Sequence, residues 1–101
     1  MRLTHQQIQA FHQALSDLQI NQYKLFLFGS RRINEAKGGD IDLVLIVEEN
    51  LKPSVLENKF AIVARMKWLY EDEKIDLTIA SPIDLQNNEF LISIKNDLVQ
   101  I

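Results

Sequence analysis

Two aspartates two residues apart are the part of this sequence best suited to chemistry. Asp40 and Asp42 stand at the start of a predicted strand whose next residues, 43–47, are all apolar. Residues two apart in a strand project from the same face, with α-carbons about 7 Å apart, so both carboxylates can hold one hard cation. Two carboxylates beside a low-dielectric layer repel each other, so a bound cation explains them better than solvation does. The alternative interpretation is a polar strand entry after the glycines at 38 and 39.

A third carboxylate and a glycine-serine pair have related settings. Asp76 lies between two apolar residues at the start of another predicted strand, although it also follows the acidic run 71–73. Gly29 and Ser30 close an earlier apolar run and open a predicted short helix. Free backbone amides and a hydroxyl at such a position favour a phosphate, but alone the pair is more typical of an ordinary strand-to-helix turn.

Three carboxylates beside a phosphate-binding turn suit Mg²⁺, which binds a few carboxylates together with phosphate oxygens and waters. Two such ions about 3.5–4 Å apart stabilise both the attacking and the leaving oxygen of an in-line displacement at phosphorus. Asp40 and Asp42 would then hold metal, and Asp76 would accept the proton of the incoming hydroxyl. The predicted reaction class is phosphoryl or nucleotidyl transfer.

Helices and strands alternate along the chain. A capping box at Thr4 predicts a helix over 4–19, and a second one, at Ser54 and Glu57, predicts one longer helix that ends among residues 71–73. The inward side chains of that longer helix are expected to be Leu56, Phe60, Val63 and either Leu69 or Tyr70. The predicted strands are 25–28, 40–48 and 75–80, and the remaining helices are 30–36 and one from Asn88 that contains Phe90, Leu91 and Ile94. Residues 98–101 either continue that last helix or form a small edge strand.

The order α-β-α-β-α-β-α predicts an α/β (α+β) domain with a small mixed sheet flanked by helices. Gly29 and Ser30 end the first strand whereas Asp40 begins the second, so they meet only if these two strands run antiparallel. Asp42 and Asp76 both begin their strands, and the helix between them allows a parallel crossover. All candidate groups then converge on one edge of a three-stranded sheet.

The chain is short and mildly acidic. Its 101 residues predict a single domain, 1–101, with one core. The net charge is 11 − 14 = −3 without a basic run, which disfavours nucleic-acid binding. The absence of cysteine excludes thiolate metal sites and cysteine nucleophiles. The first residues lack the apolar core of a signal peptide, and no apolar run approaches the roughly 20 residues of a membrane span, so we expect a cytoplasmic protein.

The stretch LFLFGSRRINEAKGGDIDLVLIV, with KIDLTIA further on, resembles the minimal nucleotidyltransferases of the DNA polymerase beta-like superfamily. These include the MNT antitoxins that bacteria and archaea pair with HEPN toxins. Their pattern is Gly-Ser, a short loop, Asp-x-Asp, and a third carboxylate on a later strand. Nine residues, 31–39, separate Ser30 from Asp40 here, one fewer than usual, which changes loop length and removes no functional group. The resemblance covers roughly residues 24–80.

The resemblance implies a nucleotidyltransferase fold and transfer from ATP or another NTP to a hydroxyl, with Mg²⁺ and release of pyrophosphate. Matched by position, the nucleotide-binding residues are Gly29, Ser30 and Arg31, and the metal-binding triad is Asp40, Asp42 and Asp76. In MNT antitoxins the acceptor is a tyrosine of the HEPN toxin, which loses its RNase activity when AMP is attached. The resemblance therefore implies a HEPN-type partner protein in a hetero-oligomer.

Two other functions stay open at this point. A binding antitoxin would neutralise its toxin by occlusion alone, with the aspartates as a relic or as a site for nucleotide-dependent assembly. Transfer to a small molecule such as an aminoglycoside resembles larger relatives with an added helical domain, for which 101 residues leave no room. The same small size predicts that the acceptor's own surface completes the site.

Overall fold

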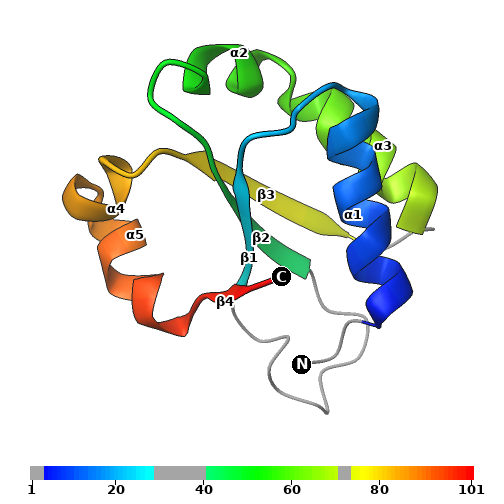
Figure 1. The fold of residues 1–101 in the computed structure, drawn as a ribbon. Helices are drawn as coiled ribbons and strands as arrows, with labels where there is room; N and C mark the ends of the chain where they lie inside the picture. The colour runs from blue at the N-terminus through cyan, green and yellow to red at the C-terminus, as the bar shows by residue number, and fades with distance from the viewer. Residues whose placement is uncertain (1–3, 29–40, 71–73) are drawn as a thin grey trace.

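The computed structural model describes residues 4–28, 41–70 and 74–101. In these ranges one sheet lies between helices on its two faces (Figure 1). The strands are β1 (Lys24–Phe28), β2 (Ile41–Ile46), β3 (Ile75–Ala80) and β4 (Val99–Gln100). The helices are α1 (His5–Asp17), α2 (Lys52–Glu57), α3 (Lys59–Tyr70), α4 (Asp84–Asn87), α5 (Glu89–Ile94) and the short 3-10 helix η2 (Lys95–Asp97). The short helix predicted at 30–36 lies outside the described residues.

The sheet has the strand order β3-β2-β1-β4. β1 and β2 are antiparallel, and β2 and β3 are parallel, as the sequence predicts. The described ranges add a fourth strand to the three expected, because β4 pairs antiparallel with β1 at the sheet edge. Of the two alternatives for residues 98–101, the edge strand is therefore the correct one. The result is a small α+β domain with a mixed sheet, compatible with a nucleotidyltransferase fold.

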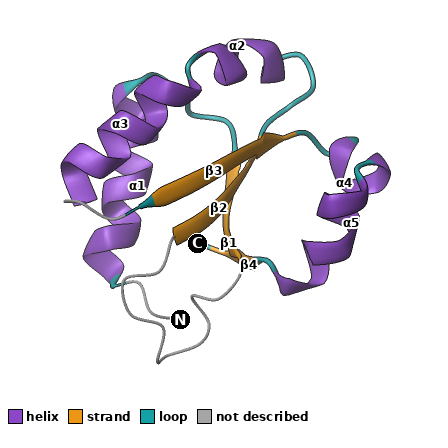
Figure 2. Cartoon of the chain, turned by 180° about the vertical axis from the view of Figure 1, so that it is seen from behind, coloured by secondary structure: helices purple, strands orange, loops and turns teal. Residues whose placement is uncertain are grey.

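One face of the sheet packs against α1 and α3 and forms the main core (Figure 2). Every second residue of β2 enters this core because successive side chains of a strand point to opposite faces. The strand residues involved include Leu25, Leu27, Leu43, Leu45, Leu77 and Ile79, and the helix residues include Phe11, Leu15, Ile62 and Met66. Burying these side chains fixes the faces of the strands, since a slip of one residue would expose them all.

The opposite face of the sheet packs against α4 and α5 around a second, smaller core. Its buried residues are Val44, Ile46, Ala80, Leu91 and Ile94, with Phe26 and Phe28 packed beside them. β2 is therefore apolar on both faces over most of its length, as expected of an interior strand. Asp42 is the exception, at the end of β2 where the chain enters the sheet.

The start of α1 follows the sequence prediction. The hydroxyl of Thr4 accepts a hydrogen bond from the Gln7 amide at 3.1 Å, and the Gln7 side chain accepts one from the Thr4 amide at 2.8 Å. This reciprocal pair is the capping box.

No helix in the described ranges has both the length and the apolar character to cross a bilayer.

The prediction of one long helix opened by Ser54 is wrong. α2 begins two residues earlier, at Lys52, with Pro53 in its first turn and no side-chain cap. Proline favours the first turn of a helix because its ring fixes φ and its missing N–H would have no partner there. Asn58 then separates α2 from α3, and its side-chain amide donates to the Ser54 carbonyl at 2.9 Å.

This break changes which side chains face the core. Phe60 is 93% exposed and Leu56 45% exposed, so the prediction that both point inward is wrong. Ile62 and Met66, four residues apart on one face of α3, are fully buried instead. Two expected residues, Val63 and Leu69, do pack partly buried against the core, and the side chain of Tyr70 lies outside the described part.

The C-terminal region agrees with the sequence in one helix and adds another. Asn88 caps α5, as its side chain accepts from the Leu91 amide at 3.1 Å. The four-residue helix α4 is an addition to the predicted elements. It forms where Asp84 accepts hydrogen bonds from the amide and hydroxyl of Ser81 and from the Lys52 ammonium. This cluster ties the end of β3 to the start of α2.

Candidate functional site

Two of the three predicted aspartates lie side by side at the end of the sheet where β2 and β3 begin. Asp42 is the second residue of β2 and Asp76 the second residue of β3, and they are direct partners in the parallel register. Neighbouring strands lie about 4.8 Å apart, and in-register partners of a parallel pair point to the same face. Asp42 is half-buried and Asp76 is exposed. The two carboxylates thus form one acidic site that solvent reaches.

A cavity of about 100 Å³ opens beside these carboxylates. Its lining residues are Phe28, Asp42, Leu43, Val44, Asp76, Thr78, Phe90 and Ile94. The cavity therefore combines two acids and one hydroxyl with a predominantly apolar wall. It lies on the face of the sheet that α5 covers, at the end where the acids replace the hydrophobic residues of the smaller core.

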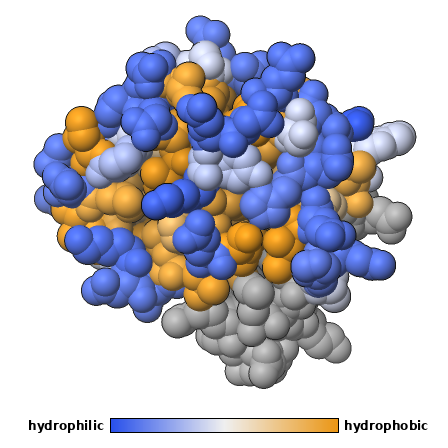
Figure 3. Space-filling model, viewed as in Figure 1, coloured by the Kyte–Doolittle hydropathy of each residue, from blue (hydrophilic) through white to orange (hydrophobic). Residues whose placement is uncertain are grey.

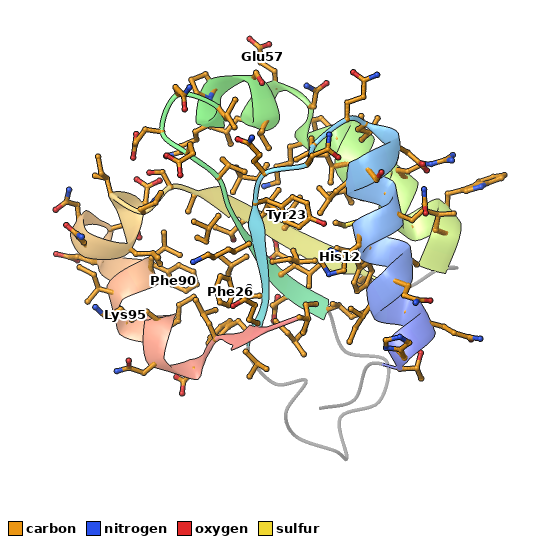
Figure 4. The ribbon with its side chains drawn as sticks, viewed as in Figure 1. His12, Tyr23, Phe26, Glu57, Phe90 and Lys95 are labelled. Atoms are coloured by element: carbon orange, nitrogen blue, oxygen red, sulfur yellow. The ribbon has the colours of Figure 1, made fainter. Side chains whose placement is uncertain are left out.

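Phe28 continues the row of acids across the sheet. It is the antiparallel partner of Asp42, so Phe28, Asp42 and Asp76 occupy one line over three adjacent strands. The ring of Phe28 contacts that of Phe90 on α5 edge-on, with centroids 6.4 Å apart and an interplanar angle of 87°. Figure 4 shows Phe90 on the side of α5 that faces the sheet.

The remaining predicted residues lie outside the described ranges. These are Gly29, Ser30, Arg31 and Asp40. Phe28, the residue before the predicted turn, and Ile41, the residue after Asp40, both lie at the edge that carries Asp42. The expectation that the glycine-serine turn lies beside the aspartates requires antiparallel β1 and β2, and that pairing is observed.

The described acids suit a hard divalent cation. Two carboxylates on adjacent strands supply oxygen ligands, which Mg²⁺ prefers, and their mutual repulsion is relieved when a cation lies between them. No group of three or more acidic or histidine side chains that could hold a metal occurs among residues 4–28, 41–70 and 74–101. Asp40, the third predicted carboxylate, lies outside these ranges.

Sequence reasoning missed the aromatic and hydroxyl wall of this cavity. The sequence places Phe90 in the last predicted helix and suggests no role for it in the site, yet it is 55% exposed beside the acids. Thr78, two residues after Asp76 in β3, is absent from the candidate residues that the sequence suggests. The available signal was periodicity, because alternation places Thr78 on the same face as Asp76.

A larger hollow of about 390 Å³ lies elsewhere, between the end of α1 and α2. Its lining residues are Leu18, Gln19, Ile20, Asn21, Gln22, Leu51, Ser54, Val55 and Asn58. None of these side chains titrates or binds a hard cation strongly, so volume alone does not make it the reactive site. The acids place the candidate chemistry in the smaller cavity.

Comparison with known families identifies the class of protein. The family model of the nucleotidyltransferase domain matches residues 8–99. The match spans nearly the whole chain, so this protein belongs to the nucleotidyltransferase domain family and its general activity is nucleotidyl transfer. No match was found among curated proteins or among solved structures. The resemblance to the superfamily is confirmed, and membership of the MNT antitoxins stays a prediction.

Proposed function

We propose that this protein transfers AMP from ATP, with Mg²⁺, to a hydroxyl of a partner protein. The observation that carries the proposal is the pairing of Asp42 with Asp76 at an open sheet edge, in a chain of the nucleotidyltransferase domain family. The partner proposed is a HEPN-type RNase toxin in the cytoplasm, and the protein is then its antitoxin.

Each predicted residue has a role in this reaction. Gly29 and Ser30 bind the triphosphate, with Arg31 in support, and Asp40 and Asp42 hold metal together with Asp76. Bound Mg²⁺ supplies Lewis-acid stabilisation of the charge on the phosphate oxygens. Asp76 is the more exposed of the two described acids, which supports its second role as acceptor of the incoming proton.

The proposed step balances as an in-line displacement. The acceptor oxygen forms a bond to the α-phosphorus, and the bond from that phosphorus to the bridging oxygen breaks. Pyrophosphate leaves, and the acceptor's proton passes to the Asp76 carboxylate. The products are an AMP ester of the acceptor and pyrophosphate.

The surface around the site supports a protein as acceptor. Hydrophobic side chains reach the surface over the region between α5 and the sheet (Figure 3), and Ile92 and Val99 are 42% and 38% exposed. An acceptor protein that covers such apolar side chains would also exclude water from the reaction.

The test uses ATP labelled on either the α- or the γ-phosphate, with Mg²⁺ and a purified HEPN-type protein encoded beside this one. Label from α-ATP on that protein, and none from γ-ATP, supports the proposal. Absence of α-label with Mg²⁺ and also with Mn²⁺ contradicts it. Occlusion is distinguished in the same system, because an Asp42→Asn variant that still neutralises the toxin fully shows that transfer is not needed.

A further inference from the structure

Phe90 is a large aromatic residue that is only partly covered at the edge of the acidic cavity. It is the second residue of α5 and 55% exposed, while its neighbours in the chain, Leu91 and later Ile94, are buried in the smaller core. Its ring contacts that of Phe28 edge-on. More than half of the Phe90 surface is thus available for another flat apolar group.

The position of Phe90 relative to the acids is set by the sheet. Phe28 lies one strand from Asp42, a distance of about 4.8 Å, and the centroid of the Phe90 ring lies 6.4 Å from that of Phe28. Phe90, Asp42 and Asp76 also line the same cavity. The aromatic wall therefore begins directly beside the carboxylates rather than on a separate surface.

A nucleotide bound at the acids has to place its nucleoside close by. The α-phosphorus is the reacting atom, and the ribose ring that carries the base is attached to it through only one oxygen and one methylene. We infer that Phe90, supported edge-on by Phe28, stacks against the base of the nucleoside triphosphate; this assignment rests on the proposed nucleotidyl transfer. Phe90 is then a nucleotide-positioning residue, while the acids carry the chemistry.

The composition of the wall predicts what it can recognise. Among the eight lining residues, the groups beside the aromatic pair are aliphatic or are the two acids, and only Thr78 adds a neutral polar group. A phenyl ring has no hydrogen-bonding group to read the edge of a base, so it responds to the area of the base face. Phe90 should therefore favour purine over pyrimidine nucleotides.

The experiment compares ligands with and without a nucleoside. Wild-type protein is titrated calorimetrically with ATP, CTP and inorganic tripolyphosphate, each with Mg²⁺. Phe90→Ala should weaken ATP binding roughly 5- to 100-fold, as expected for the loss of one aromatic stacking contact, and leave tripolyphosphate binding unchanged. Phe90→Ala should also reduce the ratio of ATP affinity to CTP affinity. Phe90→Trp should restore both the ATP affinity and this ratio.

Phe60→Ala is the matched control, because Phe60 is 93% exposed on α3, across the sheet from the cavity. Equal loss of ATP and tripolyphosphate binding in Phe90→Ala would overturn the stacking role and indicate a structural one. Unchanged ATP binding in Phe90→Ala would overturn it as well, while leaving the proposed transfer intact. A wild-type protein that binds neither ligand would instead remove the proposed function, and the stacking role with it.

Discussion

Asp42 and Asp76 are direct neighbours across the parallel pair of β2 and β3, although 33 residues separate them in the chain (76 − 42 − 1 = 33). That register brings two like charges together at the point where each strand enters the sheet. Proteins avoid such pairs unless something compensates the repulsion. In the proposed function a metal cation bound by both acids supplies that compensation, as carboxylate-bound cations do in metal-dependent phosphoryl transfer.

Replacing Asp42 by Asn should abolish nucleotidyl transfer. The variant keeps the shape and one oxygen of the side chain but loses the charge that attracts the cation. A cation's stabilisation of the transferring phosphoryl group is worth several kcal/mol, so the rate should fall by a factor on the order of 10³. The measurement is the incorporation of label from the α-phosphate of ATP into the partner protein.

Asp17→Asn is the matched control, because Asp17 lies on α1 and pairs with Arg65 of α3, away from the acids. Its rate should stay near that of the wild type. Wild-type rates in Asp42→Asn would show that the acids at the sheet edge are not the metal site.

Mg²⁺ should stabilise the wild-type fold but not the Asp42→Asn variant. Binding to the folded state alone adds about 2.7 kcal/mol at a concentration of about 100 times Kd, which is several degrees in Tm for a domain of this size. Thermal unfolding of both proteins with and without Mg²⁺ measures this effect, and an equal Mg²⁺ response in both proteins would contradict the assignment.

The directions of β2 and β3 could be predicted because the positions of the aspartates and the apolar runs of the strands indicate the same arrangement. Asp42 precedes a continuous apolar run, Asp76 begins another strand, and the helical connection between them is long enough for a parallel crossover. The sequence therefore predicts that these aspartates share one edge of the sheet, and the register of β2 and β3 confirms it. The edge strand at Val99 could not be decided, because two residues of pairing leave almost no periodicity to detect.

The helices show where local signals fail. Ser54 and Glu57 have the spacing of a capping box, but Pro53 starts the helix earlier and Asn58 ends it. The apolar stripe expected through Phe60 is consequently out of phase with the core, and Phe60 is almost fully exposed. Helix faces depend on where each helix begins, and a break of one residue between two helices carries no strong sequence signature.

Asp84→Ala should destabilise the protein by about 1–3 kcal/mol, because the buried amide of Ser81 loses its acceptor. One oxygen of Asp84 accepts from Lys52 at 2.6 Å, from the Ser81 amide at 2.9 Å and from the Ser81 hydroxyl at 3.1 Å. Ser81 is fully buried, and its hydroxyl, which has one proton to donate, keeps Glu49 as an acceptor in the variant. Denaturant unfolding at neutral pH measures the loss.

The same carboxylate predicts a pH dependence. Hydrogen bonds from Lys52 and then from the Ser81 amide hold the pKa of Asp84 below its ordinary value of 3.8. A lowered pKa in the folded state stabilises the fold above pH 3.8, and this contribution is lost as the pH falls through the folded pKa. The difference between wild type and Asp84→Ala should shrink on acidification, and a difference that grows below that pH would contradict this account.

Tyr23→Phe should destabilise the protein by removing a hydrogen bond between α1 and the residue before β1. His12 and Tyr23 lie side by side (Figure 4), with His12 Nδ1 2.5 Å from the Tyr23 hydroxyl. The other ring nitrogen, Nε2, is 3.2 Å from the Ile101 carbonyl. A carbonyl only accepts, so Nε2 donates, and in the neutral ring Nδ1 accepts from Tyr23. Loss of that hydrogen bond should cost about 0.5–1.5 kcal/mol, which denaturant unfolding of the two proteins at neutral pH measures.

Alkaline pH should remove this difference. Burial raises the pKa of the Tyr23 phenol above its ordinary value of 10.0, which means that the folded state favours the neutral form. Stability from this group is intact below pH 10.0 and falls as the pH rises through the folded pKa. Tyr23→Phe lacks the ionising group, so the wild-type Tm should approach that of the variant as the pH rises above about 10. Parallel Tm curves for the two proteins across that range would show that the ionisation of Tyr23 is not coupled to folding.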